Sequence, residues 1–240
     1  MIEPPRRAMV LAAGLGTRLR PVTATLPKPL VELDGRTLID HALDRLALAG
    51  VEHAVVNIHY LGAMIAARLA DRTTPRITIS EEAELLDTGG GVARALPDLG
   101  ETFFVVNGDV FWLDGPEPAL LRLARAFDPG ALDAMLLLQP LASAVGYDGS
   151  GDYLLDPPAR PRRRREAAGA PHLFAGIQLL HRRLFDGVTD RVFSLVRLFD
   201  RAERSGRLGA IVHDGEWFHI GTPAGLDATR ARLAGRRSGR

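Results

Sequence analysis

Cysteine is absent from this chain of 240 residues, and lysine occurs only once. Without cysteine the chain forms no disulfide and no metal site built on thiolates. Long apolar runs are also missing, since none approaches the roughly 20 residues that a membrane-spanning helix needs. The start of the chain, "MIEPPRR", is followed by "AMVLAAG", which is too short for the apolar core of a signal peptide. We therefore expect a cytoplasmic protein that does not enter a membrane.

Neither sign of charge is in excess. The 30 basic side chains are balanced by 29 acidic ones, for a formal net charge of +1. Such a balance does not favour nucleic acid as a partner. The apolar share of 46% and the charged share of 25% are typical of a globular protein. The length suffices for a core without cross-links, and we expect a monomer or a small homo-oligomer.

The single lysine, Lys28, lies in "GLGTRLRPVTATLPKPLVEL" (14–33), between two prolines. The other 29 of the 30 basic residues are arginines. Arginine presents a planar fork of donors, whereas lysine is a compact point charge on a flexible stem. Either this lysine is a chance survivor in an arginine-rich composition, or its position requires an ammonium group.

Strands and helices are predicted to alternate along the first part of the chain. Short apolar or β-branched runs predict strands at 8–13, 53–60, 76–80, 102–110 and 133–140. Helical spacing of apolar residues predicts helices at 37–50, 61–71, 89–97 and 117–127. Later segments predict a turn-rich hairpin at 146–156, strands at 172–181 and 208–221, and helices at 191–206 and 223–235.

Alternation of this kind predicts an α/β fold with a mostly parallel sheet and helices on both faces. In such sheets ligands bind at the carboxyl ends of the strands. That edge receives the turn after residue 13, the segment after Ser80 and the sequence Asn107-Gly108-Asp109. No internal repeat or long linker interrupts the chain. We expect one domain over 1–240, with a small C-terminal α/β subregion from about 141 onward that covers the site.

Three elements at this edge could hold a nucleotide. Gly14 and Gly16 follow a strand and allow backbone N–H groups to approach an anion, although the segment could equally be a tight turn with solvated arginines. Asp109 ends an apolar strand and suits Mg²⁺, or it is a simple turn aspartate. "DTGGG" (87–91) is a second flexible platform, or an ordinary glycine turn into a helix. Together with Arg18 and Lys28, these are the groups that hold a triphosphate and its metal.

The sequence also resembles a known family. "MVLAAGLGTRLRPVTATLPKPLVELDGRTLIDHALDRL" is similar to the signature of the sugar-1-phosphate nucleotidyltransferases, with Leu-Ala-Ala-Gly-x-Gly-Thr-Arg-Leu-x-Pro followed by Pro-Lys-Pro. The resemblance continues through "LLDTGGGVARAL", "FFVVNGDVFW", "FAGIQLLHRRLF" and "WFHIGTPAGL". Within the family, the chain is most similar to the N-acetylmuramate-1-phosphate uridylyltransferases of bacterial cell-wall recycling, and less so to mannose-1-phosphate guanylyltransferases.

This resemblance implies a Rossmann-like nucleotidyltransferase sheet, with a nucleotide-binding part over about 8–140 and a sugar-binding part over about 141–240. It implies that Arg18, Lys28 and Asp109 are catalytic. The residues implied to bind the nucleotide are Leu11, Ala12, Ala13, Gly14, Gly16, Thr17, Arg18, Glu82, Gly89 and Gly90. Those implied to bind the sugar are Asn107, Gly146, Asp148, Ala175 and Gly176. Asp109 and His219 are the implied ligands of a Mg²⁺ cofactor.

Two positions depart from the family pattern. The family commonly has Trp-x-Asp-x-Gly-Thr where this chain has "WFHIGT", so His219 stands in place of a metal-binding aspartate. Imidazole is a poorer Mg²⁺ ligand than carboxylate. His219 could bind through water, leave the metal to Asp109, or only pack locally. The lysine of a Glu-Lys-Pro motif, found in larger relatives, is also absent. The run Arg162–Arg165 is interpreted as a solvated hairpin tip rather than a phosphate clamp.

The expected reaction converts a nucleoside triphosphate, with UTP favoured, and a sugar 1-phosphate into a nucleoside-diphosphate sugar and pyrophosphate. N-acetylmuramate 1-phosphate is the favoured acceptor. The alternatives are guanylyl transfer to mannose 1-phosphate or transfer to another phosphate acceptor. From a different class, the chain could be a nucleotide-binding regulatory protein with weakened catalysis, for which His219 is the main argument.

Overall fold

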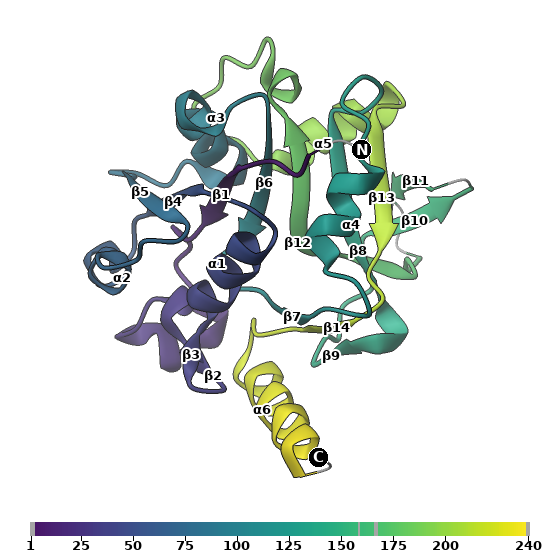
Figure 1. The fold of residues 1–240 in the computed structure, drawn as a ribbon. Helices are drawn as coiled ribbons and strands as arrows, with labels where there is room; N and C mark the ends of the chain where they lie inside the picture. Colours follow the sequence, from purple (N-terminus) through teal and green to yellow (C-terminus); the bar gives the residue numbers. More distant parts are fainter. Residues whose placement is uncertain (1–2, 158, 166–167, 239–240) are drawn as a thin grey trace.

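A mixed nine-stranded sheet forms the centre of the molecule. The structure is a computed structural model, and it describes residues 3–157, 159–165 and 168–238. Within them, the strands of this sheet lie in the order β11-β10-β12-β6-β1-β4-β5, with β8 joining β12 to β13 (Figure 1). The strands are β1 (Arg7–Leu11), β4 (His53–Ile58), β5 (Arg76–Glu81), β6 (Thr102–Asn107), β8 (Ala134–Pro140), β10 (Tyr153–Asp156), β11 (Arg160–Arg163), β12 (His172–His181) and β13 (Leu208–Val212).

Four neighbouring strands of the predicted nucleotide-binding part, β6, β1, β4 and β5, are mutually parallel. Strand β1 pairs in parallel with β4 and β6, and β4 with β5. Strand β12 runs antiparallel to both β6 and β8, while β8 and β13 are parallel. The carboxyl ends of β1, β4, β5 and β6 therefore form one edge, as the alternation of strands and helices predicted.

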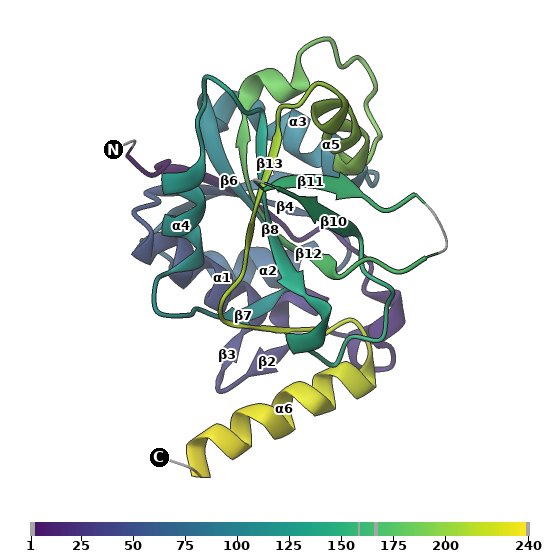
Figure 2. The same cartoon turned by 90° about the vertical axis from the view of Figure 1, so that its right-hand side faces the viewer.

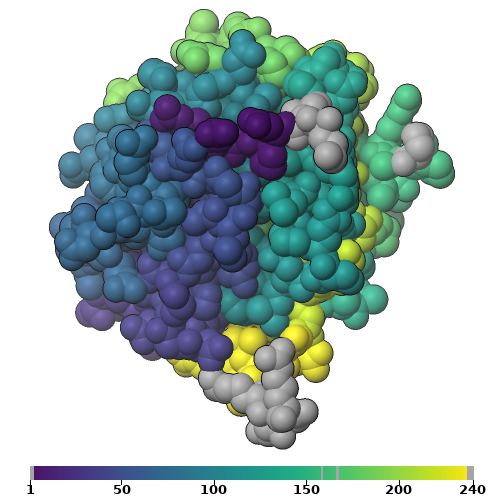
Figure 3. Space-filling model, viewed as in Figure 1, coloured from purple at the N-terminus to yellow at the C-terminus, as the bar shows by residue number. Residues whose placement is uncertain are grey.

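Helices cover both faces of this sheet, which confirms the predicted layers. Helices α1 (Leu38–Leu48), α2 (Gly62–Leu69) and α4 (Ala119–Ala126) pack on one face, and their atoms cover the strands in the space-filling view (Figure 3). Helices α3 (Asp87–Leu99) and α5 (Leu195–Arg204) pack on the other face. Among the described residues, no helix is long and apolar enough to cross a membrane.

A second structural layer lies below the carboxyl edge of the sheet. It holds the hairpin of β2 (Glu32–Leu33) and β3 (Arg36–Thr37), and a small sheet of β7 (Phe111–Leu113), β14 (Glu216–Phe218) and β9 (Ala144–Val145). Helix α6 (Pro223–Ser238) lies beneath these strands, away from the main sheet (Figure 2). One buried apolar cluster joins them, formed by Leu19, Val31, Leu33, Leu38, Phe111, Phe218, Ile220, Leu226 and Leu233.

Short helical turns fill the long loop between β1 and α1, which the sequence pattern left without structure. They are η1 (Thr17–Leu19), η2 (Val22–Ala24) and η3 (Lys28–Leu30), and two more lie later at η4 (Leu141–Ser143) and η5 (Arg182–Phe185). Helix α1 then begins directly after Thr37, whose hydroxyl oxygen accepts a hydrogen bond from the backbone N–H of Asp40. Threonine in that position satisfies an N–H that the helix itself cannot.

Most predicted elements differ from the structure by a few residues at their ends, and two differ in a way that changes the architecture. The segment 208–221 is not one strand: β13 belongs to the large sheet and β14 to the small one. The helix predicted from residue 191 begins only at Leu195, because Ser194 caps it and accepts a hydrogen bond from the N–H of Val196. Residues 191–193 are therefore not helical, and Phe193 forms backbone hydrogen bonds with Leu86, Gly89 and Gly90 at the start of α3.

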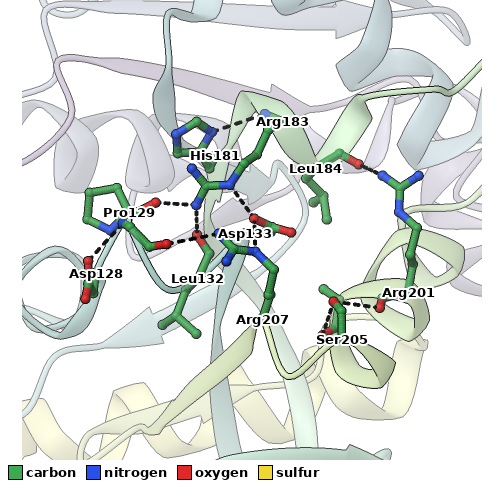
Figure 4. A network of polar contacts seen from close by, with 12 residues as sticks. Asp128, Pro129, Leu132, Asp133, His181, Arg183, Leu184, Arg201, Ser205 and Arg207 are labelled. Carbon is green, nitrogen blue, oxygen red and sulfur yellow. Dashed lines mark hydrogen bonds and ion pairs between the residues drawn. The ribbon is translucent and has the colours of Figure 1, made fainter.

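The abundant arginines cross-link the scaffold. Asp133, just before β8, accepts hydrogen bonds from Nε of Arg183 at 2.5 Å and from Nε of Arg207 at 2.8 Å (Figure 4). Arg183 also donates to the carbonyl of Leu132 at 2.6 Å. Planar guanidinium groups suit such multiple contacts. This network lies by the carboxyl end of β12, where His181 pairs with Thr102, at the edge opposite Asn107.

Candidate active site

Strand register brings the predicted site residues together. Leu11, the last residue of β1, is aligned with Asn57 of β4 on one side and with Asn107 of β6 on the other. Gly176 of β12 follows next to Asn107: a Cβ placed on Gly176 would lie 2.9 Å from Nδ2 of Asn107. With φ of +75°, Gly176 has a conformation that side chains disfavour. The absence of a side chain at Gly176 leaves room beside β12 for the side chain of Asn107.

The loop after β1 is folded back on the segment that carries Lys28. Gly16 has φ of +63°, and its carbonyl accepts a hydrogen bond of 2.6 Å from the buried hydroxyl of Thr23. A Cβ on Gly16 would lie 3.3 Å from Cβ of Lys28. Gly14, by contrast, has no atom within 4 Å of its would-be Cβ. The backbone at Gly14 is therefore open for close approach by a ligand.

Lys28 forms an ion pair with Asp109. Its Nζ atom lies 2.7 Å from Oδ2 of Asp109, and the two side chains are 11% and 37% exposed. Pro27 and Pro29 flank the lysine, and the N–H of Val31 donates to the Lys28 carbonyl at 3.0 Å. This turn holds the ammonium group at the end of β6 with little freedom. A positive and a negative charge therefore lie side by side at the carboxyl end of β6.

Two cavities meet at this ion pair. The larger, of about 430 Å³, is here called the strand-end cavity and is lined by Leu11, Ala12, Ala13, Gly14, Gly16, Lys28, Pro29, Asn57, Glu82, Leu85, Asp87, Thr88, Asn107, Asp109 and Val192. The smaller, of about 330 Å³, is the loop cavity and is lined by Leu15, Gly16, Thr17, Arg18, Lys28, Asp109 and Gly221. Gly16, Lys28 and Asp109 line both. Basic and backbone donors at the junction suit a bound anion.

Most of the residues expected to bind a nucleotide therefore line one of the two cavities. Gly89 and Gly90 line neither. Their N–H groups donate to the carbonyl of Phe193 at 2.8 and 3.1 Å. A Cβ on Gly89 would lie 2.2 Å from the Phe193 ring, and one on Gly90 2.2 Å from the carbonyl oxygen of Arg191. These glycines allow residues 191–193 to pack directly on the first turn of α3.

Glu82 lines the strand-end cavity, but its carboxylate is engaged by the protein. One oxygen accepts a hydrogen bond of 2.7 Å from Nδ2 of Asn57, and the other one of 3.1 Å from the N–H of Leu86. Oδ1 of Asn57 in turn accepts from the N–H of Ala12 at 2.8 Å. All of these bonds are buried, so they connect the ends of β1, β4 and β5 rigidly.

Asn57 was missed by the sequence reasoning, as were Leu85 and Val192, whereas Asp87 and Thr88 belong to the segment "DTGGG" (87–91) that was expected at this edge. For Asn57 a signal existed: it is an amide within the apolar run "HAVVNIHY", and such side chains need partners when buried. Val192 had no such signal, because its place depends on how residues 191–193 pack on α3.

His219 lies among residues of the predicted sugar-binding part. Its ring makes an edge contact with Tyr147, with centroids 5.6 Å apart, and a tilted contact with Trp217 at 6.1 Å. Burial lowers the pKa of His219, and the positive charges of Lys28 and Arg18 lower it further. The ring is therefore neutral near pH 7 and able to accept a hydrogen bond or to bind a metal.

The other residues expected at the sugar surround this ring cluster. The carbonyl of Ala175 accepts a hydrogen bond of 3.0 Å from Nε1 of Trp217. Asp148 is exposed, and its charge opposes the lowering of the His219 pKa. Gly146 has φ of +71°, and a Cβ there would lie 3.0 Å from Cα of Gly225. None of these residues lines the two cavities.

The arginine run lies on strand β11 and the two residues beyond it, and not at the hairpin tip as interpreted from the sequence. Arg163 forms a double hydrogen bond with Asp200 of α5, at 2.5 and 2.6 Å. Arg165 lies 3.4 Å from Glu203 of the same helix. These contacts attach the hairpin to α5, which is a structural role.

Possible metal ligands at the junction are few. Among the described residues, no group of three or more histidine, aspartate or glutamate side chains is arranged to hold a metal ion. Asp109 is the carboxylate at the junction of the cavities, and it influences the pKa of His219. A cation here would take most of its ligands from a bound phosphate or from water, which is the habit of Mg²⁺.

Comparisons with known proteins find relatives along nearly the whole chain. The family model described as nucleotidyl transferase matches residues 7–147. The N-acetylmuramate alpha-1-phosphate uridylyltransferase of Caulobacter vibrioides is 40% identical, over 98% of this chain and 99% of its own. The enzyme of the same name from Neisseria meningitidis serogroup B is 36% identical, over 95% and 98%. The mannose-1-phosphate guanylyltransferase catalytic subunit beta of Danio rerio is more distant, at 29% over 90% of this chain and 61% of its own.

Solved structures share the fold. The inositol-1-phosphate CTP transferase from T. maritima superimposes with a TM-score of 0.77 at 21% identity, over 98% of this chain and 97% of its own. The matched residues 7–147 include Gly16, Lys28 and Asp109, the three residues that line both cavities. This chain belongs to the nucleotidyl transferase family and is an enzyme of the sugar-1-phosphate nucleotidyltransferase type.

Proposed function

We propose that this enzyme transfers the uridylyl group of UTP to N-acetylmuramate 1-phosphate, giving UDP-N-acetylmuramate and pyrophosphate. The observation that carries the proposal is the Lys28–Asp109 pair at the junction of the two cavities, 2.7 Å apart. The choice of substrates rests on similarity over nearly the whole length to two uridylyltransferases of that specificity. A role in cell-wall recycling follows from the same similarity.

The transfer is a displacement at phosphorus. A phosphate oxygen of the acceptor attacks the α-phosphorus of UTP while the bond to the β-phosphate oxygen breaks, so pyrophosphate leaves with that electron pair. No covalent bond to the protein is formed. Lys28, shared by both cavities, is placed to neutralise charge that builds up on the α-phosphate. Arg18, in the loop cavity, would hold the leaving pyrophosphate.

The residues at the junction fit Mg²⁺ held mainly by substrate. Asp109 and His219 would hold it, and when bound it supplies charge neutralisation on the transferred phosphoryl group. Asp109 is 37% exposed, and Lys28 occupies only its Oδ2 side. Burial and two nearby cations lower the pKa of His219, so its ring is neutral and has a lone pair to offer.

Sugar binding is assigned to the region around His219. Asn107 lies at the end of β6 beside Gly176, and Tyr147 packs against the His219 ring. Gly146, Asp148 and Ala175 belong to the same region. A sugar phosphate bound there would reach the Lys28–Asp109 junction, because Asn107 and Asp109 both line the strand-end cavity.

A panel of four nucleoside triphosphates with several sugar 1-phosphates, assayed by pyrophosphate release, tests the proposal. We expect UTP with N-acetylmuramate 1-phosphate to give the highest kcat/KM. A preference for GTP with mannose 1-phosphate would replace the proposal with guanylyl transfer. Nucleotide binding without turnover for any pair would instead support a regulatory protein.

A further inference from the structure

Two loops bring exposed apolar side chains to the wall of the strand-end cavity. Leu85, from the loop before α3, and Val192, from the loop before α5, both line the cavity. These residues are 38% and 54% exposed, although large apolar residues are usually buried. Two such side chains on one cavity wall indicate contact with a ligand that has an apolar surface.

The two loops are joined firmly despite their distance in the sequence. The N–H of Phe193 donates to the carbonyl of Leu86 at 3.2 Å, and the N–H of Leu195 donates to the Thr88 hydroxyl at 2.9 Å. Arg191 and Glu84 add an exposed ion pair of 2.8 Å. Phe193 is buried between Val192 and α5, and its carbonyl receives two N–H groups of α3. Val192 is therefore held at the cavity rather than placed there by a free loop.

Charged groups line a different part of this cavity. Asp109, paired with Lys28, follows β6, whereas Leu85 follows β5, and β1 and β4 lie between these two strands in the sheet. The open backbone at Gly14 follows β1. A nucleoside triphosphate has the same division, because its phosphates are charged and the faces of its base are apolar. Only one orientation matches both parts, with the phosphates at Lys28 and the base at the two loops.

We propose that Val192 is a base-contacting residue, whose side chain packs with Leu85 against the face of the nucleobase. This inference rests on the proposed function and adds a residue from the second half of the chain to the nucleotide site. The Gly89-Gly90 pair contributes indirectly, since side chains at these positions would displace residues 191–193 and with them Val192.

The test compares the affinities of UTP and inorganic tripolyphosphate for the full chain, measured by calorimetry at a fixed Mg²⁺ concentration. Val192→Thr keeps the shape of the side chain and replaces one methyl group with a hydroxyl. Loss of one apolar carbon contact corresponds to about a fourfold change in Kd. We expect UTP to bind about threefold to tenfold more weakly to the variant, and tripolyphosphate to bind equally well to both proteins.

The matched control is Val196→Thr. Val196 is 40% exposed on α5, four residues further on, and does not line the cavity. Its affinity for UTP should equal that of the wild type. Unchanged UTP affinity in Val192→Thr, or equal weakening of UTP and tripolyphosphate, would overturn the inference alone. A wild type that binds no nucleoside triphosphate would overturn the proposed function and the inference with it; if it binds a different one, that triphosphate replaces UTP in the comparison.

Discussion

Nζ of Lys28 lies 2.7 Å from Oδ2 of Asp109, so the one lysine of the chain is paired with the carboxylate at the end of β6. Removing the ammonium group should remove a preorganised charge from the transferred phosphate. We expect Lys28→Ala to lower kcat about 10²-fold to 10³-fold. Lys28→Arg should also be poor, because a planar fork does not replace a point charge.

The control for Lys28 is Arg20→Ala, which removes an exposed cation from the same loop without touching either cavity. Its kcat should stay near that of the wild type. All variants should keep the wild-type Tm, because Asp109 is partly exposed and remains hydrated without its partner. Near-normal turnover in Lys28→Arg would show that any cation suffices at this position.

Asp109→Asn should abolish the dependence of activity on Mg²⁺ at ordinary concentrations. An amide lacks the negative charge that a hard cation requires. A titration of activity against Mg²⁺ should show that the variant needs far more metal or gains nothing from it. Asp227→Asn, at an exposed position on α6 that lines neither cavity, is the control. An unchanged titration curve for Asp109→Asn would move the metal site elsewhere.

Asn57→Asp should destabilise the protein in a manner that depends on pH. The new carboxylate would lie against that of Glu82, where Nδ2 now donates at 2.7 Å in a buried environment. We expect a loss of about 2–4 kcal/mol in the free energy of unfolding at pH 8. The buried pair would have a raised pKa, so the folded variant binds a proton that the unfolded chain binds less readily. The loss should therefore shrink as the pH falls toward 5.

Urea denaturation at pH 5 and pH 8 measures this difference. Asn57→Ala serves as the comparison, because it removes the same hydrogen bonds without adding a carboxylate. Its loss of stability should be similar at the two pH values. If Asn57→Asp showed no greater pH dependence than Asn57→Ala, the pair with Glu82 would not be as tightly buried as described.

His219→Asp should raise activity with Mg²⁺ if this histidine is a metal ligand. The wild type should then be comparatively better with Mn²⁺, because imidazole suits later transition metals more than magnesium. The Mg²⁺/Mn²⁺ activity ratio of the two proteins measures the effect. If His219 only packs between Tyr147 and Trp217, the ratio should be identical and the variant should have a lower Tm.

The pH dependence of wild-type activity gives a second measurement for His219. A protonated ring cannot bind a metal, so activity should fall when the ring gains a proton. Burial, followed by the charges of Lys28 and Arg18, lowers the pKa of His219 below the ordinary value of 6.5. Activity should therefore hold through that pH and decline only at lower pH. A decline that persists unchanged in His219→Asp would assign it to another group.

The sequence predicted the layers of the fold well because they depend on local patterns. The β-branched run before Asn107 and the apolar run before Gly14 each specify a strand that is buried on both faces. Parallel strands then bring their ends to one edge, so the proximity of Gly16 and Asp109 followed from topology, whereas the place of Lys28 beside them was implied by the resemblance to the family.

Features that depend on distant contacts could not be predicted in this way. The split of 208–221 into β13 and β14 arises because Leu208 pairs with Ala134, whereas Trp217 pairs with Trp112. Likewise, α3 begins at Asp87 and includes the glycines, because residues 191–193 pack on its first turn. This packing places Val192 at the cavity, and it cannot be predicted from the residues near Val192 in the sequence.

The apolar cluster beneath the glycine loop also has a consequence for how the enzyme is made. Leu19 and Val31 of the loop region share this cluster with Leu226 and Leu233 of α6. On the ribosome, α6 is synthesised long after the loop, so the loop emerges without the surface on which it rests. The sheet can form early from its own strands, but the binding loop acquires its final support only when α6 has been translated and docks.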